Sequence, residues 1–187
     1  MRLYALCDQD MLDSRGISLE HFIHIANRQK AEILQYRNKN ADISVLKKNL
    51  IAIRKQFDGF LIINDAYELV EFCDGVHLGQ EDLKTIDEDI KKAVKIVRSV
   101  IGDDKILGIS THNEEEVLVA NDLDLNYIGL GAYRNTKTKE DISAVLGDKA
   151  DDIAKHSKHL VAVIGGVRLD DTFTNITYHV IGSGLVD

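Results

Sequence analysis

Proline and tryptophan are absent from the 187 residues of this chain, and cysteine occurs only twice. Cys7 and Cys73 form no CxxC or Cys/His cluster, which excludes a zinc framework of that type. We expect both thiols to be buried and free. Without proline, the loops and helix ends lack the residue that most often stiffens or stops them.

Long apolar runs and an excess of basic charge are also missing. No run approaches the roughly 20 residues that a membrane helix needs, and the first ten residues predict a strand followed by acids rather than a signal peptide. A net charge of −8 argues against a nucleic-acid-binding protein. A local basic cluster can still bind an anionic small molecule. We expect a reducing, cytoplasmic location and leave a homo-oligomer open.

What the chain does contain is a rhythm of apolar, strand-like runs that each end in a polar cluster. Such clusters at one end of many buried strands are typical of the catalytic face of a parallel barrel. The expected strands are Leu3–Cys7, Ala31–Tyr36, Gly59–Ile63, Gly75–Leu78, Lys105–Ile109, Asn126–Leu130, His159–Ile164 and Tyr178–Ile181.

Helical periodicity fills the segments between these strands. The expected helices are Ser18–Gln29, Ile43–Phe57, Ala66–Phe72, Ile86–Ile101, one capped by Asn113, Glu140–His156 with a break near Gly147, and a weak one over Leu169–Ile176. This alternation predicts an α/β fold with parallel strands. Eight units favour a single (β/α)8 TIM barrel over residues 1–187, short, with its final helix reduced or absent.

Two acids follow neighbouring expected strands. The pair Asn64-Asp65 follows the apolar run Phe60–Ile63, and Asp82 lies in the cluster after Leu78. Either alone is an ordinary turn or helix-cap residue. Together, at the ends of adjacent parallel strands, two carboxylates can face one Mg²⁺ and leave positions open for phosphate oxygens.

Phosphate-binding chemistry is suggested by three further clusters. Gln35, Arg37 and Lys39 alternate and therefore share one side of a strand end, where arginine and lysine can hold a diphosphate. Thr136, Lys137, Thr138 and Lys139 form a loop of hydroxyls and ammonium groups. The glycine pairs around Gly166 and Gly182 end the last two strands, a frequent place for phosphate binding in barrels. Each cluster alone could equally be solvated surface.

One histidine is placed for acid–base work. His112 ends the fifth expected strand in the cluster Ser110-Thr111-His112-Asn113. A hydrogen-bonding or structural role is the alternative for this residue.

Taken in order, the segments LYALCD, QYRNK, LIIND, DGVHLGQED, ILGISTHN, YIGLGAYRNTKTK and AVIGGV resemble the thiamine phosphate synthase family over nearly the whole chain. The resemblance implies a TIM barrel that joins hydroxymethylpyrimidine diphosphate to thiazole phosphate and releases pyrophosphate. It implies that Gln35, Arg37, Lys39 and Asn64 hold the pyrimidine diphosphate and that Asp65 and Asp82 bind Mg²⁺. It further implies that Ser110 and Lys139 contact the diphosphate or the pyrimidine, and that the thiazole phosphate is surrounded by Thr136, Thr138, Gly166, Ile181 and Gly182.

The chain departs from the family pattern in its second half. The loop before the T-x-T-K motif reads Gly131–Asn135 without proline, and Gly182 occupies the position of a family serine. Two alternatives therefore stay open. One is a thiazole tautomerase of the same superfamily that uses His112. The other is a catalytically silent protein that binds thiazole phosphate or pyrimidine.

Overall fold

The computed structural model describes residues 2–135 and 145–187, and in it eight parallel strands close into a barrel in sequence order. The strands are β1 (Arg2–Asp8), β2 (Ile33–Arg37), β3 (Phe60–Asn64), β4 (Gly75–Leu78), β5 (Ile106–Thr111), β6 (Tyr127–Gly131), β7 (Leu160–Ile164) and β8 (Tyr178–Ile181). Closure is direct, because β1 pairs with both β2 and β8. The predicted (β/α)8 barrel is confirmed.

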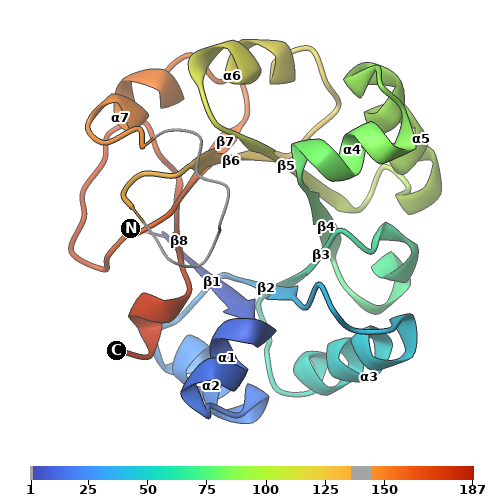
Figure 1. The fold of residues 1–187 in the computed structure, drawn as a ribbon, viewed down its shortest axis with the longest axis vertical. Helices are drawn as coiled ribbons and strands as arrows, with labels where there is room; N and C mark the ends of the chain where they lie inside the picture. Colours follow the sequence, from blue (N-terminus) through green and yellow to red (C-terminus); the bar gives the residue numbers. More distant parts are fainter. Residues whose placement is uncertain (1, 136–144) are drawn as a thin grey trace.

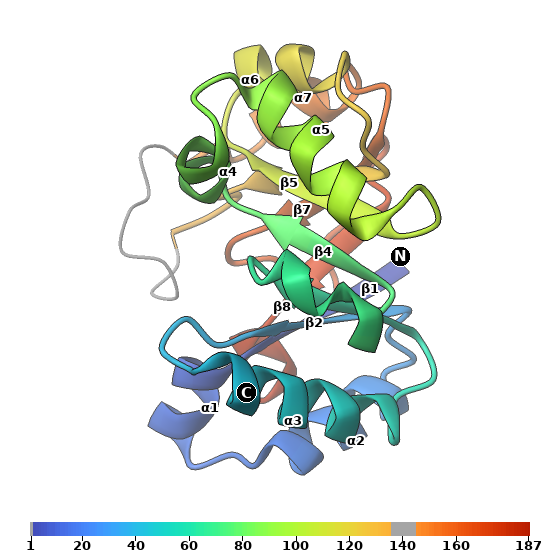
Figure 2. The ribbon, with the colours of Figure 1, turned by 90° about the vertical axis from the view of Figure 1, so that its right-hand side faces the viewer.

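Helices surround the strands as a ring (Figure 1). Their bounds are α1 (Gln9–Arg15), α2 (Leu19–Arg28), α3 (Ile43–Arg54), η1 (Tyr67–Phe72), α4 (Gln80–Ile86), α5 (Ile90–Ile101), α6 (Glu114–Ala120), α7 (Lys149–Ala154) and η2 (Ser183–Leu185). Seen from the side, α1 to α3 lie against one side of the barrel and α4 to α7 against the other (Figure 2). None of the helices in residues 2–135 and 145–187 is long and apolar enough to cross a membrane.

Two apolar layers hold this arrangement together. The larger one packs the outer faces of the strands against the helices. The smaller one fills the barrel interior with Tyr4, Leu6, Ile33, Ile62, Tyr127, Ala162, Tyr178 and Val180. Since side chains alternate along a strand, most strands supply both layers, whereas β4 supplies apolar side chains only to the outer one. The interior is therefore packed with side chains below the carboxyl ends of the strands.

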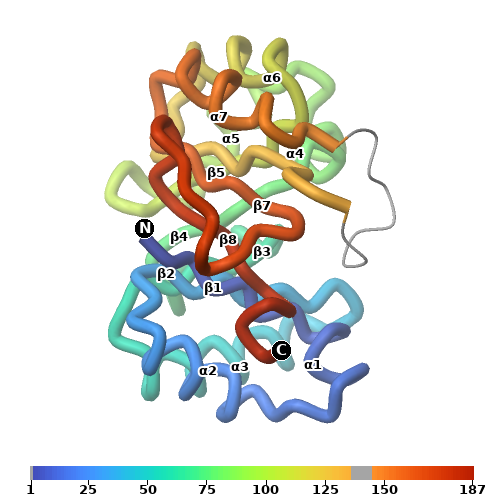
Figure 3. The backbone as a smooth tube through the Cα atoms, turned by 90° about the vertical axis from the view of Figure 1, so that its left-hand side faces the viewer, coloured from blue at the N-terminus to red at the C-terminus, as the bar shows by residue number. Residues whose placement is uncertain are grey.

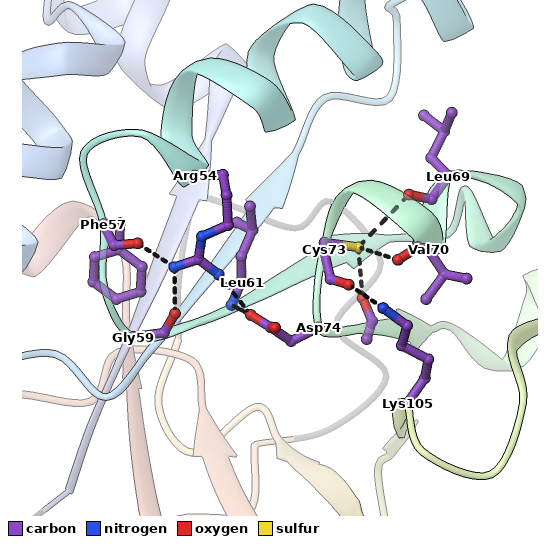
Figure 4. A network of polar contacts seen from close by, with 10 residues as sticks. Arg54, Phe57, Gly59, Leu61, Leu69, Val70, Cys73, Asp74 and Lys105 are labelled. Atoms are coloured by element: carbon purple, nitrogen blue, oxygen red, sulfur yellow. Dashed lines mark hydrogen bonds and ion pairs between the residues drawn. The ribbon is translucent and has the colours of Figure 1, made fainter.

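A polar network closes the opposite, amino-terminal end of β3 to β5 (Figure 4). Arg54 at the end of α3 donates to the carbonyl oxygens of Phe57 and Gly59 and pairs with Asp74 at 2.7 Å. Lys105 donates to the carbonyl oxygen of Cys73 at 2.7 Å. Bonds at this end, away from the polar clusters, stabilise the barrel without occupying its carboxyl end. Both cysteines are buried and free, as expected.

The ends of several helices differ from the sequence expectation. The helix expected over Ile86–Ile101 begins only at Ile90, because Asp89 caps α5 by accepting from the Lys91 amide at 2.9 Å. Ile86 is the last residue of a separate helix, α4, which the sequence did not predict. The expected helix over Ile43–Phe57 ends at Arg54. In the described part of Glu140–His156, Gly147 has φ 53° and only Lys149–Ala154 is helical.

The helix expected over Leu169–Ile176 is wrong, because the segment is irregular. Its amides bond to aspartate side chains instead of to a helical ladder. The amides of Thr174 and Asn175 both donate to Asp151, at 3.0 and 2.8 Å. Conversely, α1 was not expected, although Asp8 caps it through the Met11 amide and Gly16 ends it with φ 63°.

The last described residue lies beside α1 (Figure 3), where Asp187 pairs with Arg15 at 2.5 Å. The short η2 helix follows β8 and packs Leu185 into the outer apolar layer. The region after β8 is therefore held against α1.

Candidate functional site

A cavity of about 320 Å³ opens at the carboxyl ends of the strands. This is the end at which TIM barrels carry their active sites. All the described residues proposed from the sequence line it, from both halves of the barrel: Gln35, Arg37, Lys39, Asn64, Asp65, Asp82, Ser110, His112, Gly166, Ile181 and Gly182. Thr136, Lys137, Thr138 and Lys139 lie outside the described residues.

The basic part of the cavity comes from the end of β2. Gln35, Arg37 and Lys39 line the same cavity, as their alternation predicted. Arg37 forms an ion pair with Asp8, whose side chain is almost fully buried at the end of β1. Asp8 also accepts from the Met11 amide at 3.0 Å, so its two oxygens hold the start of α1 and the guanidinium together. The guanidinium is thereby anchored on one side and has further N–H groups for a ligand.

The acidic part of the cavity comes from Asp65 after β3 and Asp82 in the first turn of α4. Burial, followed by the nearby Asp82 carboxylate, raises the pKa of Asp65 to about 6, while Lys39 and Arg37 oppose the rise. Asp65 has φ 65°, a left-handed conformation that aspartate adopts more readily than most residues. Asp82 accepts from the Gly79 amide at 3.2 Å, which fixes its carboxylate beside the cavity.

These acids fit a hard divalent cation of the Mg²⁺ type. The nearby Asp82 carboxylate raises the cost of ionising Asp65, and a cation placed between the two side chains would offset that cost. Within residues 2–135 and 145–187, no group of three or more His, Cys, Asp or Glu side chains is arranged around one point. Two protein ligands with remaining positions for phosphate and water suit Mg²⁺ in particular.

Polar side chains continue from the cavity into the barrel interior. Tyr4, His77 and Tyr127 are buried there and line the cavity floor. Tyr4 bonds to Gln35 at 2.7 Å and to Tyr127 at 2.9 Å. His77 lies between Tyr127, at 2.9 Å, and Ser110, at 3.0 Å. Gln35 and Ser110 were expected from the sequence, whereas the three residues that connect them were not.

His112 is held at the cavity rim by Glu116. The Glu116 carboxylate accepts from the His112 backbone amide and lies 2.9 Å from its Nδ1 atom. Because Nδ1 faces the carboxylate, Nε2 is the ring nitrogen available to a ligand. The expected cap is also confirmed, since Asn113 accepts from the Glu116 amide at 2.9 Å.

The other half of the cavity is built from the loops after β6, β7 and β8. Arg134 forms a two-pronged ion pair with Asp171, at 2.6 and 2.7 Å, and donates to the Gly166 carbonyl oxygen at 2.9 Å. Gly166 has φ 64°, and a Cβ atom there would lie 2.7 Å from the Arg134 Cβ. Arg134 therefore joins the proline-free loop to the Gly165-Gly166 turn, where bare backbone approaches the cavity.

The residues missed from the sequence carried signals of two kinds. Asp8 follows the first expected strand, as Asp65 follows the third, so the rule of polar strand ends would have found it. Tyr4, His77 and Tyr127 are polar residues inside apolar strands at inward positions. Only the closed barrel shows that these three lie in contact across its centre.

Known proteins resemble this chain over most of its length. The profile of the family described as thiamine monophosphate synthase matches residues 3–183. Similar proteins include the thiamine-phosphate synthases of Persephonella marina (33% identity, covering 89% of this chain and 77% of the relative) and Alkaliphilus oremlandii (35%, 98% and 85%).

The fold has a counterpart among solved structures. A thiamine phosphate pyrophosphorylase from Pyrococcus furiosus superposes with a TM-score of 0.75 at 22% identity, over 97% of this chain and 85% of that protein. At that identity the likeness shows the barrel alone. Family membership rests on two other findings, the match of the family profile across residues 3–183 and relatives above 30% identity. They show that this chain belongs to the thiamine monophosphate synthase family.

Proposed function

We propose that this protein is a Mg²⁺-dependent transferase that joins hydroxymethylpyrimidine diphosphate to thiazole phosphate, giving thiamine phosphate and pyrophosphate. The observation that carries the proposal is that two cations, Arg37 and Lys39, and two acids, Asp65 and Asp82, line the same cavity. Relatives that share a third of the sequence carry the name thiamine-phosphate synthase. The cations and acids of this cavity suit a diphosphate that binds with a metal.

Different side chains bind the leaving diphosphate and the pyrimidine ring. Arg37, anchored by Asp8, and Lys39 bind the diphosphate and stabilise the negative charge that develops as pyrophosphate departs. Mg²⁺, held by Asp65 and Asp82, would neutralise further charge on the same phosphates. Lys139, outside the described residues, is proposed for the same task. No protein nucleophile is needed, because positioning and charge stabilisation carry the reaction.

The pyrimidine and the thiazole occupy the two halves of the cavity. Gln35, Asn64 and Ser110 line the half below the diphosphate and hold the pyrimidine, which becomes a short-lived carbocation as the C–O bond breaks. Gly166, Ile181 and Gly182 line the other half, for which Thr136 and Thr138 are also proposed. There the thiazole nitrogen lies ready to form the new C–N bond.

Release of pyrophosphate from the two substrates tests this proposal. We expect turnover with Mg²⁺, none with excess chelator, and recovery when Mg²⁺ is restored. Asp82→Asn should lower kcat at least tenfold. Glu81→Gln, on the exposed neighbouring residue, is the matched control and should leave kcat within about twofold. No release of pyrophosphate by the well-folded parent protein would refute the proposal.

A second candidate function rests on His112. Its ring is oriented by Glu116 and lines the cavity, as proton transfer in a thiazole tautomerase would require. This reading assigns no task to Asp65 and Asp82, so we place it second. If the protein tautomerises thiazole phosphate, His112→Ala should abolish that rate, whereas an unchanged rate would eliminate the candidate. Binding of both substrates without either reaction would indicate the silent binding protein.

Three expectations accompany the proposal. They are the cytoplasmic location, the absence of nucleic-acid binding and a possible homo-oligomer. Cell fractionation, a DNA-binding titration and analytical ultracentrifugation would test them in turn.

A further inference from the structure

A continuous chain of hydrogen-bonded side chains crosses the floor of the cavity from β5 to β3. Its central members are almost fully buried, with exposed fractions of 1% for Tyr4, 3% for Tyr127 and 5% for Gln35. In order, the chain consists of Ser110, His77, Tyr127, Tyr4, Gln35, Asn64 and Asp65.

The direction of the chain is fixed at its Asp65 end. An ionised carboxylate can only accept, so Asn64 must donate its Nδ2 proton to Asp65, at 2.5 Å. The Oδ1 atom of Asn64 then faces Gln35 and accepts from its Nε2 atom at 2.7 Å. That leaves Gln35 Oε1 as the atom facing the barrel centre. Both amides are therefore held in one orientation.

Donor and acceptor can be assigned in the same way for the hydrogen bonds that cross the barrel. Gln35 Oε1 accepts the Tyr4 hydroxyl proton at 2.7 Å, so Tyr127 must donate to Tyr4 at 2.9 Å. Burial raises the pKa of both phenols, which keeps both protons in place. Because the Tyr127 proton is committed, His77 Nδ1 must donate to the Tyr127 oxygen at 2.9 Å.

The last link determines what Ser110 presents to the cavity. In a neutral imidazole protonated at Nδ1, the Nε2 atom is an acceptor. The Ser110 hydroxyl, 3.0 Å away, therefore donates its proton to His77. The lone pairs of Ser110 Oγ remain for a ligand, so this atom accepts and does not donate.

Glycines at inward positions make room for the two rings of the chain. A Cβ atom at Gly108 would lie 2.1 Å from Tyr127 Cζ, and one at Gly129 would lie 3.0 Å from His77 Cε1. Contacts of 2.1 Å do not occur, so any side chain at residue 108 would displace the phenol. The backbone of β5 and β6 is thus shaped around Tyr127 and His77.

We propose that Tyr4, Tyr127 and His77 are positioning residues that fix the Gln35 amide and turn Ser110 Oγ into a pure acceptor, so that the site selects a heteroaromatic ring that donates an N–H to Ser110. The proposal rests on the function proposed above and deepens it, because an aminopyrimidine is such a ring. Lone pairs directed at the ring also favour the positive charge that develops on it. A ring without the donor would leave the partly buried Ser110 Oγ without a hydrogen-bond donor.

The tautomer of His77 tests the chain in the ligand-free protein, whatever the enzyme's activity. Long-range ¹⁵N–¹H correlation spectra at pH 8 should show His77 protonated at Nδ1 and bare at Nε2. Comparison with His77→Gln assigns the signals among the seven histidines. The Tyr127→Phe variant should lose this preference, because Nδ1–H no longer has a phenol oxygen to donate to. A proton on Nε2 in the parent protein would overturn the proposal.

A pair of tyrosine variants tests the positioning role. Tyr127→Phe removes one hydroxyl from the chain. Tyr178→Phe removes one from an interior ring that packs edge-on against Tyr4, with 6.4 Å between ring centres, and that lies 4.5 Å from the Arg2 guanidinium without being a member of the chain. We expect Tyr127→Phe to lower kcat about ten- to a hundredfold with the KM for thiazole phosphate unchanged. Tyr178→Phe should stay within about twofold.

Melting curves and the binding of pyrimidine diphosphate complete the comparison. A folded Tyr127→Phe protein with the kcat and KM of the parent would refute the positioning role. If the parent has no turnover, the proposed function fails, and calorimetric binding of the pyrimidine diphosphate to the two variants decides the inference instead. Equal affinity of Tyr127→Phe and Tyr178→Phe would then overturn it, and a tenfold weaker Tyr127→Phe would support it.

Discussion

Replacing Asp65 with asparagine tests the electrostatics of the acidic pair, because the change removes a charge and almost no volume. Asparagine tolerates the left-handed conformation of residue 65, where φ is 65°. Its Oδ1 atom can still accept the bond from Asn64. Any change in stability therefore reports the charge.

The size of the effect follows from the raised pKa. The pKa of Asp65 moves from 3.8 to about 6, mainly through burial and then through Asp82. A rise in pKa of this size corresponds to about 3 kcal/mol, since each tenfold change in the acid dissociation constant is worth about 1.4 kcal/mol. Water reaches this half-buried side chain, so we expect about 2 kcal/mol.

The sign follows from which state holds the proton. Between about pH 4 and about pH 6, folded Asp65 keeps a proton that the unfolded chain has released, so the free energy of unfolding falls as the pH rises. Asp65→Asn escapes this loss. We expect the metal-free variant to match the parent near pH 4 and to be about 2 kcal/mol more stable at pH 8, a rise in Tm of about 4–8 °C.

Urea denaturation with a chelator present, from pH 4 to pH 8, measures this difference. Asp58→Asn, which changes an exposed carboxylate, is the matched control and should move the free energy of unfolding by less than about 0.5 kcal/mol. Added Mg²⁺ should stabilise the parent but not Asp65→Asn, and the variant should have lost turnover. A variant no more stable than the parent at pH 8, or a difference independent of pH, would show the reasoning to be wrong.

Two further predictions concern the frame of the site. Gly108→Ala places a Cβ atom against the Tyr127 ring and should lower the free energy of unfolding by about 1–3 kcal/mol, measured in urea; unchanged stability and turnover would contradict the packing. Asp171→Asn breaks the pair with Arg134, which holds the pKa of Asp171 below 3.8. We expect a loss of about 1–2 kcal/mol at pH 7 that disappears as the pH falls through the lowered pKa; the same loss at pH 2 as at pH 7 would argue against it.

The strands were predictable because burial on both faces leaves a clear local signal. Runs such as Phe60–Ile63 are apolar without a break, and a parallel sheet is the structure that buries them. Helix ends were less predictable. The irregular course of Leu169–Ile176 depends on Asp151 and Arg134, which lie far away in sequence. No window of local sequence contains those partners.

The candidate site likewise contains residues that the sequence predicted and residues that only the structure shows. Asp65 and Asp82 were found because each follows its own strand, and strand ends in a parallel barrel share one face. Asp8, which anchors Arg37, also follows an apolar strand run. Its ion pair with Arg37 forms because the pairing of β1 with β2 places the two residues side by side. Tyr4, His77 and Tyr127 are separated by 50 residues or more and have no shared motif.

The rhythm of apolar strands and polar ends was enough to specify the barrel and its working face, because periodicity and strand order are local properties of the chain. Which polar groups touch across the barrel was decided by closure, through the pairing of β1 with β8 and the register of β4 to β6. Contact between Tyr4, Tyr127 and His77 needs strands of opposite sides of the barrel to point their side chains at one centre. That convergence is a property of the closed sheet, and the linear sequence does not express it.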